Sequence, residues 1–596
     1  MAKLEVYLNE YNVLMNNTVY FPLASGQLRG YAETKAVIRD NYQFMPFLFI
    51  RDHPDRIVSQ YKSPAVAGFS CSIWNINLSL AVARQVKKKF PTCLIVFGGP
   101  SVPLKPVDFF VRYPFVDVTV RGEGEHTFAE MLVRLLLERD FSNIAGICYH
   151  NCHQRKVVRN QDRALEETLD TFPSPYLEGL YGYLLESEVD FQAIIETNRG
   201  CPFKCSYCFW GEGKRYRFYS PERVRALADW CGANKIKYVF CADSNFGMLK
   251  HDLEIANYFV EAKTKYGFPE KFRACCGKTA EETIYQIGYL LHKNDMEKGI
   301  TLSRQSNDAE TLKNVGRKNI KQSVYDNLQR RYNEEDIPTY TELILGLPGE
   351  SYQSFLNGME EILQSGIKNQ LIVYICEVYP NTELASPGCQ RKFGISTVRI
   401  PITEIHGSVR PTDIPAEYNE IVVSTATMPT EDWKRALVIS WLMQLLHGLK
   451  LGFYVLIYLN EHYGSRYTDF FEYVAGQPKG SILSNTVLGF KLWADLISKG
   501  NPRGMVIPEF GSIYWEPEEA AYLSIIGQKD NFHEELERLC QDYLNSAGPY
   551  DRNELREVIE YQKARIPSIK DYKDKETFAR QVVIYGRKSD RMLVDT

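Results

Sequence analysis

The first part of the chain alternates short apolar runs with segments of helical periodicity. Three apolar runs end in small residues: AVAGFSCSIWN, TCLIVFGGP and FVDVTVRGEGE. The first and third are followed by the amphipathic segments LSLAVARQVKKKF and HTFAEMLVRLLLERD. Apolar runs that end in glycine and lead into helices are typical of βαβ units in a parallel sheet. The pattern predicts an α/β, doubly wound (Rossmann- or flavodoxin-like) domain over residues 1–165, closed by a hairpin over residues 144–160.

The ends of these predicted strands are candidate ligand contacts. In a doubly wound sheet, ligands bind beyond the carboxyl ends of the strands. Small residues there let a bulky ligand approach the backbone, although any one of them is equally well explained by a tight turn. The candidates are Gly68, Ser70, Ser72, Gly98, Gly99, Pro100, Gly122, Glu123, Gly124 and Glu125.

A second alternating series begins near Gln192, after residues 166–190, which we interpret as an extended linker. Six apolar runs follow one another with helical segments between them: AIIETNRG, IKYVFCADSNFG, KFRACCG, GITLSRQS, TYTELILGLPGE and LIVYICEVYPNT. Six strand–helix units in order predict a partial, TIM-like (β/α)6 barrel over residues 191–394. The catalytic residues of such a barrel are expected at the carboxyl ends of its strands.

Beyond Gly394 the pattern changes to helical segments and long loops, so residues 395–596 are expected to form a mainly helical C-terminal domain. Within it, residues 437–459 are apolar over a length that suffices to span a membrane. Because Gln444, His447 and Lys450 interrupt this stretch, two buried helices joined near residues 448–452 explain it better. A membrane-associated helix is the alternative.

Composition and charge narrow the class of protein further. Charged residues make up 24% of the chain and the net charge is -4, with acids and bases interspersed, which disfavours nucleic-acid binding. The N-terminal residues MAKLEVYLNEYNVLMNN lack the pattern of a secretory signal, so we expect a cytoplasmic protein with reduced thiols. In that compartment, clustered cysteines are candidates for metal binding or catalysis.

Three cysteines lie close together after the first strand of the second series, in RGCPFKCSYCFW (residues 199–210). Cys201, Cys205 and Cys208 offer three thiolates from one loop, and thiolates are the usual ligands of iron–sulfur clusters. A structural zinc site needs four ligands, and no further Cys or His occurs nearby, so zinc fits worse. A four-iron cluster held by three thiolates leaves one iron open to an exogenous ligand.

At these residues the chain resembles the radical S-adenosylmethionine (SAM) superfamily, whose signature is a Cys-x3-Cys-x-aromatic-Cys loop. The resemblance implies a [4Fe-4S] cluster on Cys201, Cys205 and Cys208, with SAM bound to the open iron and cleaved to a 5'-deoxyadenosyl radical. Arg317 is interpreted either as a partner of the SAM carboxylate or as a solvated helix arginine. The SAM contacts that the resemblance implies are Tyr207, Asp243, Asn245, Gln305, Ser306 and Ile344.

The N-terminal domain also carries a resemblance. VYFPLASGQLRGYAE, GFSCSIWN, VFGGPSVP and VRGEGEHTF together resemble the cobalamin-binding domain of B12-dependent radical SAM enzymes, so the likeness covers about residues 18–390. It implies that the strand-end residues named above bind cobalamin. The chain lacks the motif Asp-x-His-x-x-Gly: Asp52 and His53 are adjacent, and His126 has no Asp two residues before it. The lower face of the cobalamin is therefore expected to lack a histidine ligand.

Resemblance to the class B radical SAM methyltransferases implies transfer of a methyl group from SAM, by way of methylcobalamin, to an unactivated carbon or phosphorus of a small-molecule, peptide or natural-product-like substrate. One alternative is a B12 radical SAM enzyme that catalyses a non-methylating rearrangement, cyclisation or oxidation. Another is a non-enzymatic iron–sulfur or corrinoid-binding protein. The expected partners are the substrate and a reductant such as flavodoxin or ferredoxin. The substrate pocket is expected between the cofactor domains and the C-terminal helices, whose aromatic residues Trp441, Tyr454, Tyr458 and Trp515 we interpret as core.

Overall fold

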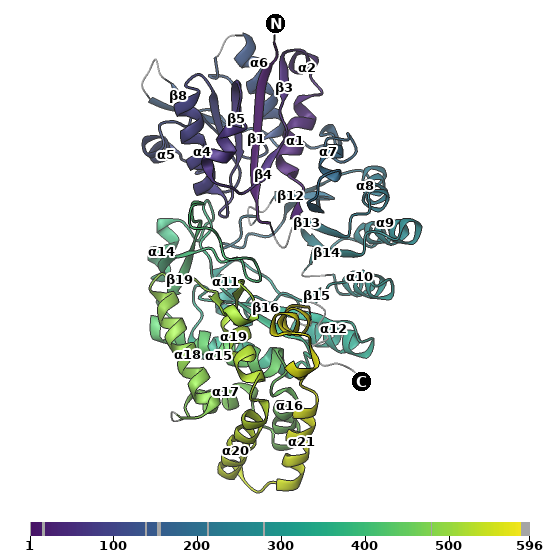
Figure 1. Cartoon of the computed structure of the whole chain (residues 1–596), viewed down its shortest axis with the longest axis vertical. Helices are drawn as coiled ribbons and strands as arrows, with labels where there is room; N and C mark the ends of the chain where they lie inside the picture. The colour runs from purple at the N-terminus through teal and green to yellow at the C-terminus, as the bar shows by residue number, and fades with distance from the viewer. Residues whose placement is uncertain are drawn as a thin grey trace.

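The chain folds into three regions that follow one another along its longest axis (Figure 1). The computed structural model describes residues 2–14, 18–137, 140–151, 156–210, 214–277, 280–477 and 480–585. An α/β region (purple) lies at one end, a β/α region (teal) follows it, and helices coloured green to yellow lie at the other end. The domain limits at residues 165, 190 and 394 stay a prediction.

The described residues of the N-terminal region form an eight-stranded sheet, parallel from β3 to β7. Its order is β3 (Tyr42–Phe44), β1 (Leu4–Asn12), β5 (Pro64–Ser70), β6 (Leu94–Gly98), β7 (Val118–Val120), β8 (Ile147–Asn151) and β9 (Lys156–Arg159), with β4 (Leu48–Ile50) also paired to β1. The predicted βαβ pattern and the antiparallel hairpin β8–β9 are confirmed, although residues 152–155 of that hairpin lie outside the described residues.

Helices cover both faces of this sheet, and β1 is therefore buried on both of its faces. Val6 and Leu8 pack toward α1 (Leu23–Ala32), α2 (Ala36–Asn41) and α6 (Glu125–Leu137). Tyr7 and Tyr11 pack toward α3 (Pro54–Ser59), α4 (Ile76–Lys89) and α5 (Val107–Arg112). Alternate residues of a strand point to opposite faces, so β1 is a central strand that the sequence pattern did not identify.

The central region is the predicted partial barrel, built from two hydrogen-bonded groups of parallel strands. One group has the order β14 (Lys271–Cys276), β13 (Tyr238–Phe246), β10 (Asp190–Ile195) and β2 (Thr18–Tyr20); the other has β15 (Ile300–Thr301), β16 (Thr339–Leu345) and β17 (Gln370–Ile375). The helices between and after these strands are α8 (Pro221–Ala233), α9 (His251–Tyr266), α10 (Glu281–Lys293), α11 (Ala309–Asn314), α12 (Gln322–Glu334), α13 (Tyr352–Gln364) and α14 (Pro387–Phe393). The alternation of strands and helices confirms the fold class.

The first predicted barrel strand, AIIETNRG, is broken in two. β10 ends at Ile195, and β11 (Asn198–Cys201) pairs antiparallel with β12 (Lys214–Phe218). The carboxylate of Asp243 on β13 accepts hydrogen bonds from the backbone N–H of Thr197 (2.8 Å) and from Nδ2 of Asn198 (2.7 Å). These side-chain bonds replace ladder bonds, so the chain leaves the sheet just before the cysteines.

The segment between the two α/β regions differs from the extended linker that the sequence suggested. Leu169–Thr171 forms a 3₁₀ turn and Gly182–Leu185 forms α7. Tyr176 and Tyr181 are fully buried, with ring centroids 5.6 and 4.8 Å from that of Phe21. Burying these large aromatic rings stabilises a packed segment over an extended one.

The C-terminal region begins with the hairpin β18 (Ser396–Pro401)–β19 (Tyr418–Ser424) and continues mainly as helices. These are α15 (Thr430–Met443), α16 (Phe453–Tyr463), α17 (Tyr467–Ala475), α18 (Ile482–Ser498), α19 (Pro517–Ile526), α20 (Lys529–Ala547), α21 (Arg552–Ala564) and α22 (Lys575–Phe578), with the short strands β20 (Met505–Val506) and β21 (Tyr514–Trp515) before α19.

The apolar stretch at residues 437–459 is two helices, as predicted. A π-helical segment, Gln444–Gly448, follows α15, and the chain turns before α16 begins. In the described part of the chain no single helix is long and apolar enough to cross a membrane. The pair Thr430–Gly448 and Phe453–Tyr463, bent by 96°, has the length and composition of a broken membrane span. Leu437 and Leu459, near the two ends of the stretch, are buried in the largest apolar core.

Candidate active site

The loops at the carboxyl ends of the two sheets contact one another. Asn381, in the loop after β17, donates from Nδ2 to the carbonyl oxygens of Pro100 (3.0 Å) and Val102 (2.9 Å), in the loop after β6. Glu417 accepts hydrogen bonds from the backbone N–H groups of Asn77 and Leu78, both at 2.9 Å, in the first turn of α4. The two ends at which ligands bind in such folds therefore face a shared space.

The three cysteines lie on the loop side of the β11–β12 hairpin. Cys201 and Cys205 are buried, and Cys208 is partly exposed. The backbone N–H of Cys208 donates to the carbonyl of Cys205 (3.0 Å), and that of Ser206 donates to the carbonyl of Val315 (2.9 Å). The loop is thus held both by its own turn and by the chain that follows α11.

The donor set of this loop fits an iron–sulfur cluster. Among the described residues, no three His, Cys, Asp or Glu side chains converge as ligands of a single metal ion. In a four-iron cluster each thiolate binds its own iron, so the three sulfurs need not meet at one point. Nδ2 of Asn245 lies 3.4 Å from Sγ of Cys201 and donates to it. Hydrogen bonds to the sulfurs are one of the means by which proteins tune such clusters.

Tyr207, Arg317 and two predicted SAM contacts gather around the cysteine loop. Nη1 of Arg317 donates to the Tyr207 hydroxyl (3.3 Å), and Nη2 donates to the carbonyl of Ser303 (2.7 Å). Arg317 is 5% exposed, so its interpretation as a solvated helix arginine is wrong. Ile344 packs in the same small apolar cluster as Tyr207, and its backbone N–H donates to the carbonyl of Gln305 (2.8 Å).

Buried acceptors without partners mark where a ligand with donors fits. Within the described residues, Oδ1 of Asn198, Oδ1 of Asn245 and Oε1 of Gln305 have no hydrogen-bond partner. A buried unpaired acceptor costs about 1–3 kcal/mol, which a ligand that donates a hydrogen bond removes. Gln305 also has a φ of +65°, a conformation that non-glycine residues adopt at a cost. SAM carries amino and hydroxyl donors, so these residues fit it.

Asp243 and Ser306, also predicted to contact SAM, have protein partners. Asp243 holds Thr197 and Asn198, as described above, and burial raises the pKa of its carboxyl to about 7. The Ser306 hydroxyl donates to Oε1 of Glu350 (2.6 Å), and burial raises the pKa of Glu350 to about 8. Asp243 thus positions the backbone that follows β10, and Ser306 pairs with a buried carboxyl. Contact of both residues with SAM stays a prediction.

The predicted cobalamin residues fall into different structural roles. Ser70 and Gly98 are the last residues of β5 and β6, as expected. Gly122 has a φ of +71°, and no described atom outside its two chain neighbours lies within 4 Å of the position that a Cβ would take. That open space beside the backbone fits the close approach of a flat, bulky ligand such as cobalamin.

Other small residues of this set also have contacts within the protein, and their contact with cobalamin stays a prediction. Gly68 lies inside β5 rather than at its end, and a Cβ there would be 3.0 Å from Leu8. At Gly99 (φ +98°) a Cβ would be 2.6 Å from the carbonyl oxygen of Cys71, so the glycine lets two loops touch. Ser72 lies in the turn before α4, where its backbone N–H donates to Asn75 (2.8 Å).

The loop after β7 faces the barrel through its acidic side chains. Oε1 of Glu125 lies 2.7 Å from Nη2 of Arg199, and Glu123 lies 3.6 Å from Nη1 of Arg199. Glu123 also accepts from both terminal nitrogens of Arg217, one of them at 3.0 Å. Arg199 and Arg217 belong to β11 and β12, the hairpin that carries the cysteines. We call this set the interdomain ion cluster; contact of Glu123, Gly124 and Glu125 with cobalamin stays a prediction.

The two histidines considered for cobalt have protein partners. The ring nitrogens of His126 lie 2.6 Å from the Tyr31 hydroxyl and 3.0 Å from Oε2 of Glu166. Nδ1 of His53 accepts from the backbone N–H of Asp55 (3.2 Å), at the start of α3.

Exposed aromatic side chains at the loop ends were missed by sequence reasoning. Trp74, in the loop after β5, is 40% exposed, and Phe209 and Trp210, directly after the last cysteine, are 40% and 47% exposed. Large apolar side chains left open at ligand-binding loops offer a surface to a substrate or cofactor. Sequence reasoning could have found them from their positions, in the loop after β5 and directly after the last cysteine.

A corrinoid-type α/β domain joined to a partial barrel with a three-cysteine loop defines a radical SAM enzyme with a cobalamin domain. Residues 195–362 match the Radical SAM superfamily, and residues 45–132 match the B12 binding domain. The cobalamin-dependent radical SAM methyltransferase TokK of Streptomyces tokunonensis is 33% identical over 93% of this chain and 84% of its own length. The 2-(S-pantetheinyl)-carbapenam-3-carboxylate methyltransferase of Streptantibioticus cattleyicolor is 33% identical over 87% and 76%.

The chain therefore belongs to the cobalamin-dependent radical SAM methyltransferases, and its cofactors are a [4Fe-4S] cluster, SAM and cobalamin. Two solved structures share its fold. The radical SAM methyltransferase TsrM of Kitasatospora setae, with cobalamin and cluster bound, is 14% identical, with a TM-score of 0.55 over 84% of this chain and 100% of that chain. The cobalamin-dependent SAM radical enzyme OxsB is 14% identical, with a TM-score of 0.58 over 94% and 83%.

Proposed function

We propose that this enzyme methylates an unactivated carbon of a small carbapenam carboxylate that carries a thioether arm. The observation that supports this substrate class is the extent of the likeness to 2-(S-pantetheinyl)-carbapenam-3-carboxylate methyltransferase. It covers 87% of the chain, which is more than the two cofactor regions contain. Binding the cofactors alone does not require a shared C-terminal region, whereas binding a related substrate does.

The residues of this chain have three tasks in that reaction. When bound, the cluster with SAM supplies a hydrogen-abstracting radical, and the cobalamin supplies the methyl group. Asn245 and Gln305 hold SAM through their unpaired buried oxygens. The interdomain ion cluster keeps the cobalamin loops in register with the cysteine hairpin, so that radical and methyl group act on one substrate carbon.

We also propose the cellular setting of the reaction. The enzyme works in the cytoplasm, where its cysteine thiols stay reduced, and it receives electrons from a flavodoxin or ferredoxin. A net charge of -4 with interspersed signs supports a protein that does not bind nucleic acid. Ser70, Ser72, Gly98, Gly99, Pro100 and Gly122 bind cobalamin.

Anaerobic reconstitution tests the proposed substrate class. The holoenzyme, a low-potential reductant, methyl-deuterated SAM and 2-(S-pantetheinyl)-carbapenam-3-carboxylate are expected to yield a product that carries the deuterated methyl group. 5'-Deoxyadenosine and S-adenosylhomocysteine should accumulate in equal amounts. Substrate consumed without incorporation of label would support the non-methylating alternative. Substrate left intact while SAM is cleaved would show that the substrate class is wrong.

Paired cysteine variants check the assignment of the cluster. Cys205→Ala is expected to lose the visible absorbance of the four-iron cluster and the cleavage of SAM. Cys540→Ala, in α20 of the C-terminal region, serves as the control and is expected to keep both. Equal iron content in the two variants would contradict the assignment.

A further inference from the structure

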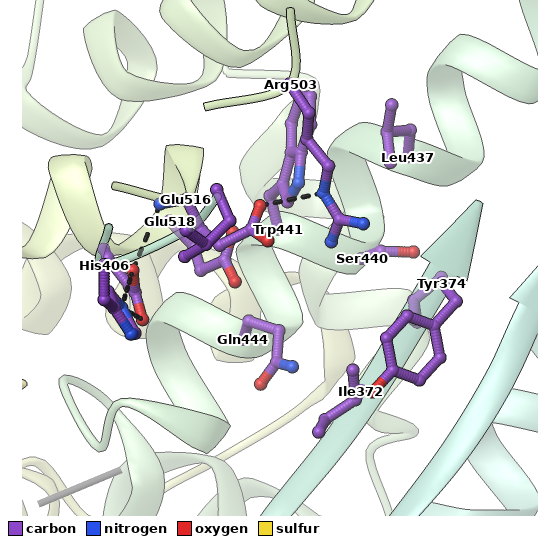
Figure 2. A pocket seen from close by; sticks show the side chains of 13 residues that line it. Ile372, Tyr374, His406, Leu437, Ser440, Trp441, Gln444, Arg503, Glu516 and Glu518 are labelled. Carbon is purple, nitrogen blue, oxygen red and sulfur yellow. Dashed lines mark hydrogen bonds and ion pairs between the residues drawn. The ribbon is translucent and has the colours of Figure 1, made fainter. Parts of the chain in front are cut away.

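A cavity of about 190 Å³ lies between the last barrel strand and the C-terminal helices (Figure 2). Ile372 and Tyr374 of β17 form one wall. Leu437 and Trp441 of α15 form a second wall, and Arg503 closes the cavity from the segment before β20. The prediction that Trp441 is buried is confirmed, but one side of its ring borders this cavity.

The cavity adjoins the proposed SAM site through the register of two strands. Leu371 and Ile375 of β17 are buried in the core shared with the helices, so Ile372 and Tyr374 lie on the opposite face, toward the barrel interior. In the ladder to β16, Ile372 pairs with Glu342 and Tyr374 pairs with Ile344. Ile344 is a proposed SAM contact, so a molecule in the cavity lies one strand away from SAM.

Two polar side chains offer hydrogen bonds in the cavity. Nε of Arg503 donates to Oε2 of Glu516 (2.9 Å), while its terminal nitrogens point into the cavity toward Ser440 and bond to no described residue (Figure 2). Gln444, the first residue of the π-helical segment, places its amide in the cavity as well. π-Helical segments are rare and occur frequently at functional sites.

The charges that line the cavity disfavour an anionic ligand. The positive charge of Arg503 is already balanced by Glu516, and Glu518 and Glu519 add further carboxylates. His406, the other basic group of the lining, lies 2.9 Å from Glu519. A carboxylate entering here meets no net positive charge, whereas an amide finds donors in Arg503 and Gln444 and an acceptor in the Gln444 carbonyl.

We propose that this cavity binds an amide-bearing segment of the thioether arm of the substrate, a pantetheine-like chain. The inference rests on the proposed function, and it assigns the arm to residues of the C-terminal region. Methylenes of the arm pack on Ile372, Leu437 and Trp441, and an amide bonds to Arg503 and Gln444. At about 30 Å³ per water, the volume equals about six waters, enough for one amide and its flanking methylenes. The bound arm holds the reacting ring beside SAM.

The first test compares two substrates in the holoenzyme. The probes are 2-(S-pantetheinyl)-carbapenam-3-carboxylate and its analogue with an S-ethyl arm. We expect kcat/KM of the wild type to favour the long arm by about tenfold or more, mainly through KM. Ile372→Trp, which fills the cavity, and Arg503→Leu, which removes the guanidinium donors, are expected to bring this ratio close to one. Arg538→Leu, an exposed arginine on α20, is the matched control and keeps the ratio of the wild type.

The second test measures binding without turnover. Free pantetheine should bind the wild-type holoenzyme and Arg538→Leu in calorimetry, and Ile372→Trp should lose that binding. This test does not depend on whether the carbapenam is a substrate. If neither carbapenam is methylated but pantetheine binds as described, the proposed function fails and the cavity assignment stands. If both carbapenams react equally well, or if Ile372→Trp binds pantetheine as tightly as the wild type, the cavity assignment is wrong. The Ile372→Trp variant keeps the test decisive even if Arg503→Leu does not fold.

Discussion

Replacing Arg199 by Met removes the centre of the interdomain ion cluster. Arg199 stands two residues before Cys201, and its guanidinium reaches Glu125 (2.7 Å) and Glu196 (3.1 Å) at the same time. Its side chain is 11% exposed and that of Glu125 is 5% exposed. Breaking a buried pair by removing one partner leaves an uncompensated charge, at a cost of about 3–5 kcal/mol. The acidic Glu125 keeps some stabilisation from the N-terminus of α6, so we expect the lower end, about 3 kcal/mol.

Hydrogen exchange measures this loss where it occurs. The backbone N–H of Phe128 donates to the carbonyl of Gly124 (2.8 Å) in the first turn of α6. A loss of about 3 kcal/mol in the free energy of opening speeds its exchange by about a hundredfold. The double variant Arg199→Met/Glu125→Gln lacks the orphaned charge and should recover much of the protection.

A second readout separates domain alignment from stability. If the ion cluster aligns the two cofactor regions, Arg199→Met should form more 5'-deoxyadenosine for each methyl group transferred than the wild type does. The control is Arg225→Met, which removes an exposed pair with Glu261 and should change neither quantity. The reasoning is refuted if Arg199→Met exchanges at the wild-type rate, or if the double variant is no better protected than the single one.

Three further variants test the cofactor residues. Gly122→Val fills the open space at a positive φ and should weaken cobalamin binding, measured by titration in the visible range. The control is Gly179→Val in the interdomain segment, which has a φ of +69° and open space as well; it carries the same backbone strain and should keep cobalamin binding. Asn245→Leu removes the hydrogen bond to Cys201, which favours the more negative, reduced cluster. The reduction potential of the cluster should therefore fall in an EPR-monitored titration. An unchanged potential would show that the Asn245 amide does not bond to the cluster sulfur. The pKa of Asp243, about 7 in the folded chain against an ordinary 3.8, means that the folded state binds the extra proton, so the apoprotein should lose stability as pH rises from about 4 to 7. Thermal midpoints of Asp243→Asn should fall less over this range than those of the wild type, and equal slopes would contradict the assignment.

The sequence predicted what local patterns encode. The βαβ units, the position of the cysteines directly after the first barrel strand and the break between α15 and α16 each depend on residues close together in the chain, and each is confirmed. That these cysteines hold the cluster stays a prediction. Contacts between residues far apart in the sequence could not be predicted. The residues next to Gly68 and Gly122 in the sequence do not show that the first lies in the core and the second beside open space. The difference is that a Cβ at Gly68 would meet Leu8, whereas one at Gly122 would meet no neighbouring element. The pairing of Arg199 with Glu125 likewise joins positions that no periodicity connects.

The placement of β2 determines how the two cofactor regions can be separated. The chain runs through β1 in the N-terminal sheet, pairs Thr18–Tyr20 with β10 of the barrel, and returns to the first sheet at β3. A cut near residue 165 therefore does not yield two complete folding units. A barrel produced from residue 191 onward would expose the edge of β10, and an unpaired edge strand invites aggregation. Separate study of the radical and corrinoid halves thus requires Thr18–Tyr20 to be fused ahead of β10, while Leu4–Asn12 stays with the first sheet. The reason is that the chain forms this barrel strand before it completes the first domain.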